Sequence, residues 1–223
     1  AGSGSQGGGI YTFGGAISLT NSTVSGNSTT GVFSVGGGIY SSGFSSGGAI
    51  TLANSIVLGN SSTVGTTADD EIGVNIATIT ETGPNILGVV GVTPADAAVA
   101  DVFASIDGTT GGGLLADNGG PVMTIALKAD LANPALDAGD DSLAPLTDAR
   151  GASRFDFAGV ANNAANISDL GAYEFQTMAE ETPSLVVTIL TDTVVAFDGE
   201  TSLREAIAFA NSNPDASTIT FAP

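Results

Sequence analysis

The chain of 223 residues contains no cysteine, no histidine and no tryptophan, and only four of its residues are lysine or arginine. The missing cysteine and histidine exclude disulfide bonds, thiol catalysis, zinc sites built on these residues and histidine-based catalytic triads. Four cations cannot form the basic face that neutralises nucleic-acid phosphates, so we expect no nucleic-acid partner. Because no run of about 18 apolar residues occurs, we also expect no membrane span.

Acidic residues and glycine are abundant instead. The chain has 23 aspartate and glutamate residues, a net charge of −19 and 32 glycines. Hydrophobic residues make up 42% of it and aromatic residues only 6%, so a core must consist mainly of Val, Ile, Leu and Ala. The negative charge has two interpretations, namely solubility in a salty or extracellular medium and the binding of divalent cations.

The first part of the chain contains an internal repeat. The sequence GGGIY occurs at residues 7–11 and again at 36–40, and residues 15–28 match residues 48–61. Each copy runs from a glycine cluster through an alternating apolar strand to a Gly-Asn turn. Short strands and frequent turns that recur about every 30 residues predict an all-β solenoid, in which each coil buries its inner face against the next.

Equivalent positions of the two copies are expected to stack along the solenoid axis. We expect a structural ladder of Tyr11 with Tyr40 and of Asn21 with Asn54. The competing interpretation of the asparagines is N-glycosylation, but Asn54 does not begin an acceptor sequence. Residues expected to face inward are Ile17, Leu19 and Val24 in the first copy and Ile50, Leu52, Ile56 and Leu58 in the second.

The stretch from GGGIY to AISLTNSTVSGNS resembles the right-handed parallel β-helix repeats of large bacterial surface and secreted proteins, including adhesin-like chains. The resemblance covers residues 1–65 and implies a right-handed parallel β-helix, located outside the cell or on the bacterial cell surface. Residues 66–113 are expected to continue this helix less regularly. They include a predicted short α-helix, Pro94–Phe103, with Thr93 as its N-cap.

A different pattern occupies residues 114–176. Its motifs are LLADNGGPVMTIAL (114–127), NPALDAGD (133–140), TDARG (147–151) and DLGAYEF (169–175). Their order resembles the block called choice-of-anchor Q, which ends such β-helices before a surface anchor or a further module. The resemblance implies a β-rich end region that completes the solenoid, and it implies no catalysis.

This block concentrates charge of both signs. Two arginines in so acidic a chain are expected to pair with carboxylates in a buried salt-bridge network. The members of that network would be Arg150, Arg154, Asp148, Asp169 and Glu174. The alternative is a Ca²⁺ site, although the spacing fits no EF-hand loop. Its candidate ligands are Asp137, Asp140, Asp141, Asp148 and Asp156. Calcium is the only cofactor that the sequence indicates.

After a predicted linker at residues 177–184, the segment 185–223 has its own pattern. Ser202 and Glu205 form a capping box at the start of a predicted helix over residues 202–210. The stretch TSLREAIAFANSNPDASTITF resembles the CSLREA domain, with Thr201 in place of the cysteine; in that family the segment starts a β-helix and its helix covers the open end. The residues expected to serve capping or assembly are Leu203, Ala206, Ile207, Ala210, Ile219 and Phe221.

An end block followed by a start segment predicts one period of a tandem array, or a subunit that assembles head to tail with copies of itself through its C-terminal segment. We therefore expect a non-enzymatic structural protein of an extracellular filament or surface scaffold. A glycan-binding adhesin is the alternative. A polysaccharide lyase or hydrolase is less favoured, because basic residues are scarce and the repeat coils lack carboxylates. We assign no catalytic residue.

Overall fold

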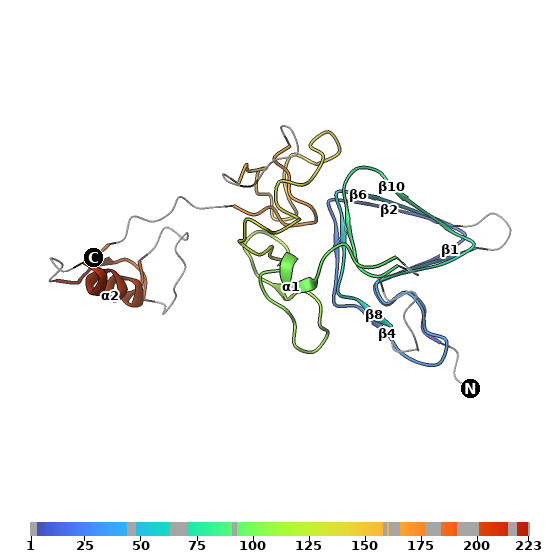
Figure 1. Ribbon diagram of the computed structural model, residues 1–223, viewed down its shortest axis with the longest axis horizontal. Coiled ribbons are helices and arrows are strands. Elements are labelled where there is room, and N and C mark those ends of the chain that lie inside the picture. Colours follow the sequence, from blue (N-terminus) through green and yellow to red (C-terminus); the bar gives the residue numbers. More distant parts are fainter. Residues whose placement is uncertain are drawn as a thin grey trace. The chain divides into compact units, whose positions relative to one another are not determined.

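The computed structural model describes residues 4–43, 48–62, 71–90, 93–157, 160, 166–176, 184–190, 201–213 and 218–222 (Figure 1). The chain divides into two compact units, Ala1–Phe175 and Gln176–Pro223. This division falls beside the predicted linker, of which only residue 184 belongs to the described part.

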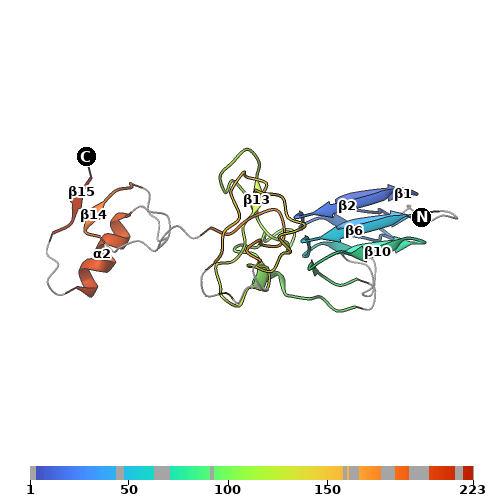
Figure 2. The same ribbon diagram turned by 90° about the horizontal axis from the view of Figure 1, so that it is seen from above.

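The first unit begins with three stacked coils. The first coil contains β1 (Ile10–Phe13), β2 (Ala16–Thr20), β3 (Thr23–Val24) and β4 (Ser28–Thr29). The second contains β5 (Ile39–Ser42), β6 (Ala49–Ala53), β7 (Ile56–Val57) and β8 (Ser61–Ser62), and the third contains β9 (Ile72–Asn75), β10 (Thr78–Glu81) and β11 (Ile86–Leu87). Corresponding strands pair in parallel, so the sheets run β1-β5-β9, β2-β6-β10, β3-β7-β11 and β4-β8 (Figure 2). The predicted parallel β-solenoid is therefore confirmed.

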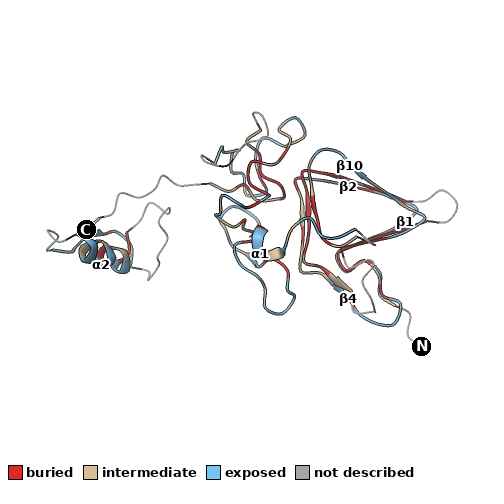
Figure 3. Ribbon diagram, in the orientation of Figure 1, coloured by how far each residue is buried: buried red, intermediate tan, exposed pale blue. Residues whose placement is uncertain are grey.

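The repeat places like residues in columns through the coils. Ile10 pairs with Ile39, which in turn pairs with Ile72, and Ile17 pairs with Ile50. These inward-facing residues form one hydrophobic core inside the coils, and its members in the second coil are fully buried. Burial is less complete in the first and third coils, where Ile10, Leu19 and Ile79 are only partly buried, and Figure 3 colours the chain by burial.

A second core lies outside the coils. The alternation of side chains turns Val57 inward, whereas Ile56 and Leu58 belong to a cluster with residues of the segment 93–175. The expectation that Ile56 and Leu58 face the inside of the solenoid is therefore wrong, although both are buried. The reason is that the sheet β3-β7-β11 is covered on both faces, so its apolar residues run continuously instead of alternating.

The segment 93–175 contains little regular structure. It holds the antiparallel pair β12 (Leu115–Ala116) and β13 (Thr124–Ile125), and the helix α1 (Val99–Val102). The β-rich end region expected from the resemblance is thus not found in the described part of residues 114–176. The helix is also shorter than predicted and lacks a side-chain N-cap. Thr93 instead forms a bridge with Val90, and the Asp96 N–H donates to the Leu87 carbonyl, which keeps this stretch extended.

The second unit contains β14 (Val186–Val187), α2 (Leu203–Ser212) and β15 (Thr220–Phe221), with the two strands paired in parallel. The predicted capping box is confirmed, because Ser202 accepts a hydrogen bond from the Glu205 N–H and Glu205 accepts one from the Ser202 N–H. Within the described residues α1 and α2 are the only helices, so the chain is all-β in class. Neither helix is long and apolar enough to span a membrane.

Candidate functional site: a buried carboxylate network

Carboxylates hold the irregular segment 133–175 together by accepting hydrogen bonds from backbone amides. Asp148 accepts from the N–H groups of Arg150, Ala152 and Glu174 at 2.8, 2.9 and 2.9 Å. Since these loops lack sheet partners, a charged acceptor satisfies amide groups that would otherwise be buried unpaired. The other acids that act in this way are Asp137, Asp141, Asp169 and Glu174.

Three of these acids connect successive loops. The Asp137 N–H donates to Asp169 Oδ1 at 2.8 Å, and the Asp169 N–H donates to Glu174 Oε2 at 3.0 Å. The Asp137 carboxylate accepts from the Phe157 N–H at 3.1 Å, and the second oxygen of Asp169 accepts from the Phe175 N–H. Exposure of Asp137, Asp169 and Glu174 is 1%, 1% and 0%. The three carboxyls therefore form a desolvated cluster.

Two arginines supply the positive charge. Arg150 Nε lies 2.8 Å from Asp148 Oδ2, and Arg154 Nη1 lies 2.6 Å from Glu174 Oε2. The Arg150 guanidinium also stacks over the Tyr173 ring at 3.7 Å from its centroid. Asp137 and Asp169 differ from Asp148 and Glu174, because no cation among the described residues lies within ion-pair distance of either.

This difference in charge partners separates the pKa values. Burial and the neighbouring charge of Glu174 raise the pKa of Asp169 to about 8, against the opposing effect of its amide donors. Burial also raises the pKa of Asp137 to about 6. Burial raises the pKa of Glu174 as well, although the Phe155 amide and Arg154 oppose this. For Asp148, burial is outweighed by the Glu174 amide and Arg150, so its pKa is lowered.

The five candidate calcium ligands are not brought together. Asp137 and Asp148 are buried acceptors of amide hydrogen bonds, and Asp141 accepts from the Ile167 and Ser168 N–H groups. Asp140 accepts from Ser142, and Asp156 belongs to no group of three potential ligands. No group of three acidic residues that could hold a metal ion occurs in the described part of the chain. The carboxylates of Asp137, Asp140, Asp141 and Asp148 accept hydrogen bonds from backbone donors, so the calcium site stays a prediction that the described residues do not support.

The structure places the predicted ladder residues in adjacent coils. The Tyr11 and Tyr40 rings are stacked, with their centroids 6.0 Å apart and their planes 14° apart. Asn54 Nδ2 donates to Asn21 Oδ1 at 3.3 Å, and both residues adopt positive φ, 48° and 41°. Gly83, with φ 77°, takes the turn in the third coil. Asparagine tolerates this backbone region better than most residues, so turn chemistry accounts for the pair.

The asparagine pair also joins the coils to the carboxylate network. Asn21 Nδ2 donates to the Asp169 carbonyl at 3.2 Å. Asn54 Nδ2 donates to the Asp140 carbonyl at 2.9 Å, and Asn54 Oδ1 accepts from the Asp140 N–H at 2.8 Å. Both asparagines are buried, at 8% and 0% exposure, which argues against their modification by sugar.

Sequence reasoning missed a second asparagine ladder and its terminal partner. Asn60 Oδ1 accepts from Asn27 N and Asn27 Nδ2 at 3.0 and 2.9 Å. Asn60 Nδ2 donates in turn to Glu71 Oε2 at 2.6 Å. The repeat offered the signal for Asn27 and Asn60, since they too hold equivalent positions. No sequence pattern marked Glu71, because its partners come from the preceding coil.

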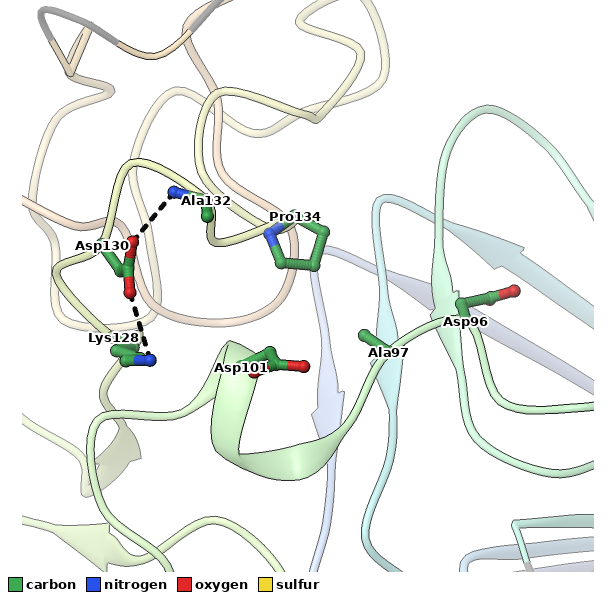
Figure 4. Close-up of a pocket in the computed structure, with 7 residues that line it drawn as sticks. All are labelled: Asp96, Ala97, Asp101, Lys128, Asp130, Ala132 and Pro134. Atoms are coloured by element: carbon green, nitrogen blue, oxygen red, sulfur yellow. Dashed lines mark hydrogen bonds and ion pairs between the residues drawn. The ribbon is translucent and has the colours of Figure 1, made fainter.

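A groove with a volume of about 360 Å³ lies beside α1 (Figure 4). Lys128 and Asp130 form an exposed ion pair at 3.2 Å on one side, and Asp96 lies on the other side. Asp130 also accepts from the Ala132 N–H, and Asp96 accepts from the Leu87 N–H. Two of the three carboxylates that line the groove, those of Asp96 and Asp130, therefore already have partners, and the described residues of the groove form no combination of groups that indicates catalysis.

The capping residues of the second unit differ in exposure. Ala206 is buried, Ala210 and Ile219 are half-buried, and Leu203, Ile207 and Phe221 are 46%, 44% and 59% exposed. This unit therefore presents an apolar surface around α2 and β15.

Comparison of the chain with models of known protein families found no match, and searches of curated proteins and of solved structures found none either.

Proposed function

We propose that the chain is a non-enzymatic structural module of an extracellular or bacterial cell-surface scaffold, in which copies assemble head to tail through the C-terminal unit. The observation that carries this proposal is the uncovered edge of the first coil. On that side, β1 and β2 have no neighbouring strand among the described residues, and Tyr11 and Phe13 are 49% and 51% exposed. An open parallel edge is a template for pairing with another chain.

The C-terminal unit also supports the proposal, because it has open strand edges and exposed apolar residues. Strands β14 and β15 pair with each other, and no described strand covers their outer edges. Val186 is 42% exposed, so apolar surface accompanies the open edge, together with that of Leu203, Ile207 and Phe221. The resemblance of residues 114–176 to choice-of-anchor Q and of the C-terminal segment to CSLREA agrees with the order of an end block followed by the start of a new solenoid.

The cations of the segment 93–175 support a structural role over catalysis. Lys128 is paired with Asp130, Arg150 with Asp148 and Arg154 with Glu174. An enolate-stabilising residue in a lyase must be free to approach its substrate, and these three already hold carboxylates.

One observation favours the second candidate, a glycan-binding adhesin. The exposed ring of Tyr11 continues the tyrosine stack on Tyr40 and offers an aromatic platform for a sugar. A glycan array with wild-type protein and Tyr11→Ala tests this function. Binding that is lost in the variant supports the adhesin, and the absence of binding to any glycan excludes it.

Electron microscopy at rising protein concentration, combined with light scattering, tests head-to-tail assembly. We expect linear particles whose mass increases with concentration. Phe221→Lys places a charge on the exposed face of β15 and should abolish this growth, whereas the matched control Ala208→Lys, on an exposed position of α2, should not. Single particles of constant mass at every concentration would disprove the proposal.

A further inference from the structure

The two ends of the solenoid differ in charge. No charged residue occurs before Asp69, so the first and second coils are entirely uncharged in a chain of net charge −19. Natural proteins usually protect exposed strand edges with charges, prolines or bulges. The first coil has neither a charge nor a proline, and this makes its edge an exception that requires an explanation.

The polar ladders show what the first coil offers to a neighbour. Ser55 Oγ accepts from the Ser22 N–H at 3.2 Å, and Asn60 Oδ1 accepts from Asn27 N and Nδ2. The second coil thus presents a hydroxyl and an amide oxygen to the first coil. The Ser22 hydroxyl donates to the Thr20 carbonyl, and the Ser55 hydroxyl donates to the Ala53 carbonyl in the same way. The first coil therefore repeats this serine arrangement at its open edge.

Some backbone N–H and C=O groups of the first coil also point away from the second coil. The Ala49 N–H donates to the Gly15 carbonyl, and the Asn21 N–H donates to the Ala53 carbonyl. In a parallel ladder, a residue that is hydrogen-bonded to a neighbouring strand directs both its N–H and its C=O toward that strand. The odd-numbered residues of β2 therefore direct these backbone groups toward the second coil. Ser18 therefore directs its N–H and C=O away from the second coil, toward the position of a preceding strand.

The third coil is closed at its corner by Glu71. This carboxylate is 5% exposed and accepts from Gly59 N at 2.7 Å, from Asn60 N at 3.1 Å and from Asn60 Nδ2 at 2.6 Å. The asparagine ladder consequently ends in an acceptor that has no N–H to donate to a further coil.

Glu81 closes the third coil at its core. It pairs in register with Leu52, which pairs with Leu19. In the third coil this apolar column therefore ends in an exposed carboxylate. A further coil stacked on this end would have to bury the charge, which is strongly unfavourable. An inward-pointing charge is one of the known devices that prevent edge pairing.

Asp96 closes the third coil at β11. Ile86 N and Gly88 N donate to the second coil, so the backbone groups of Leu87 face outward. Both are occupied: the Leu87 N–H donates to Asp96 Oδ2, and the Leu87 carbonyl accepts from the Asp96 N–H, each at 2.8 Å. The segment around Asp96 thus lies where a fourth coil would pair.

From these contacts we infer that the outer edge of the first coil is the docking surface for a second copy of the chain, and that Glu71, Glu81 and Asp96 make the third-coil end a closed terminus. The occupant is the β14–β15 pair of the second copy, because the third-coil end of that copy is closed and no described strand covers the outer side of β15 in its C-terminal unit. An uncharged acceptor face also presents no like charge to an acidic partner. This inference rests on the proposed function.

Sedimentation velocity of the full chain and its variants tests the docking surface. Ser18→Pro removes an outward N–H from an edge strand without removing a bond to the second coil. We expect it to weaken association about tenfold or more, and the matched control Ser18→Ala, which keeps the N–H, to associate like wild type. Circular dichroism checks that each variant is folded. If Ser18→Pro does not fold, Tyr11→Lys places a charge at the same edge and should have the same effect.

A gain of assembly provides an independent check. Glu81→Leu extends the leucine column of Leu19 and Leu52 to the third coil and should increase the mean mass of the assemblies, because a second stacking mode becomes available. Glu81→Gln, which stays polar, should increase it less. Unchanged association in both Ser18→Pro and Tyr11→Lys, or no increase with Glu81→Leu, would overturn the inference.

The two proposals fail in different ways. If Phe221→Lys abolishes assembly and the folded first-coil variants do not, head-to-tail assembly stands and the docking surface is wrong. If Ser18→Pro abolishes assembly and Phe221→Lys does not, the first-coil edge is supported but another part of the second copy occupies it, and the proposed role of the C-terminal unit is wrong. A monomer at all concentrations overturns both.

Discussion

Replacing Asp169 with asparagine should flatten the pH dependence of the stability of the first unit. Asp169 is 1% exposed and lacks an ion-pair partner among the described residues, and burial raises its pKa from the ordinary 3.8 to about 8. The folded state therefore favours the protonated acid. Below pH 3.8 the acid is protonated in both states and its contribution is fully present. As the pH rises toward 8, the unfolded chain ionises first, and this stability is lost.

The expected magnitude follows from the difference between the two pKa values. Each pH unit between 3.8 and about 8 lowers the free energy of unfolding by about 1.4 kcal/mol, so this one acid accounts for about 6 kcal/mol across the whole window. Asparagine cannot ionise, and one of its two polar atoms still accepts an amide hydrogen bond. The variant should lose about 1–3 kcal/mol at low pH, where one donor is left unpaired.

Urea denaturation followed by circular dichroism between pH 5 and 8.5 measures this slope. We expect wild-type stability to fall as the pH rises toward 8, and the fall to be smaller in Asp169→Asn by about 1.4 kcal/mol for each pH unit below about 8. Asp101→Asn removes an exposed carboxylate and should retain the wild-type slope. Wild-type stability that is constant or rises with pH, or equal slopes in wild type and Asp169→Asn, would refute the reasoning.

Substitutions at three further positions probe the contacts that join the coils, the network and the second unit. Arg154→Ala leaves Glu174 charged and buried without its cation, so urea denaturation should show a loss of about 3–5 kcal/mol; a loss below about 1 kcal/mol would contradict this. Asn54→Ala should cost about 3 kcal/mol, because it removes three hydrogen bonds at φ 48°. Asn54→Gly, which tolerates that φ, should recover part of the loss. Ser202→Ala should destabilise α2 by about 1 kcal/mol, seen as faster amide exchange in that helix.

The fold was accessible from sequence because the repeat is local. Equivalent residues such as Ile17 and Ile50 recur with the same neighbours, and alternation turns them to the same face, so a stacked parallel arrangement follows from periodicity. The capping box of Ser202 and Glu205 was accessible for the same reason, because its two hydrogen bonds connect residues three positions apart.

The fate of the acidic residues was decided by tertiary structure. Asp137 and Asp148 were candidate calcium ligands and Glu174 was a member of the predicted salt-bridge network, and nothing in their spacing distinguishes a metal ligand from an acceptor of amide hydrogen bonds. The distinction depends on which loops meet: Phe157 N reaches Asp137, and Arg154 reaches Glu174. Such partners are far apart in sequence, and the segment has no regular period from which their approach can be inferred.

The sequence by itself determined the coils, their register and the helix cap, because each depends on spacing within a repeat or a single turn. Only the tertiary structure decided which end of the solenoid is closed. Glu71, Glu81 and Asp96 are ordinary acids in the sequence, and they become terminators because the last coil leaves backbone groups and a core column that each can reach. A strand edge exists only after the strands have stacked. The side chains that cover such an edge can therefore be recognised only in the three-dimensional structure.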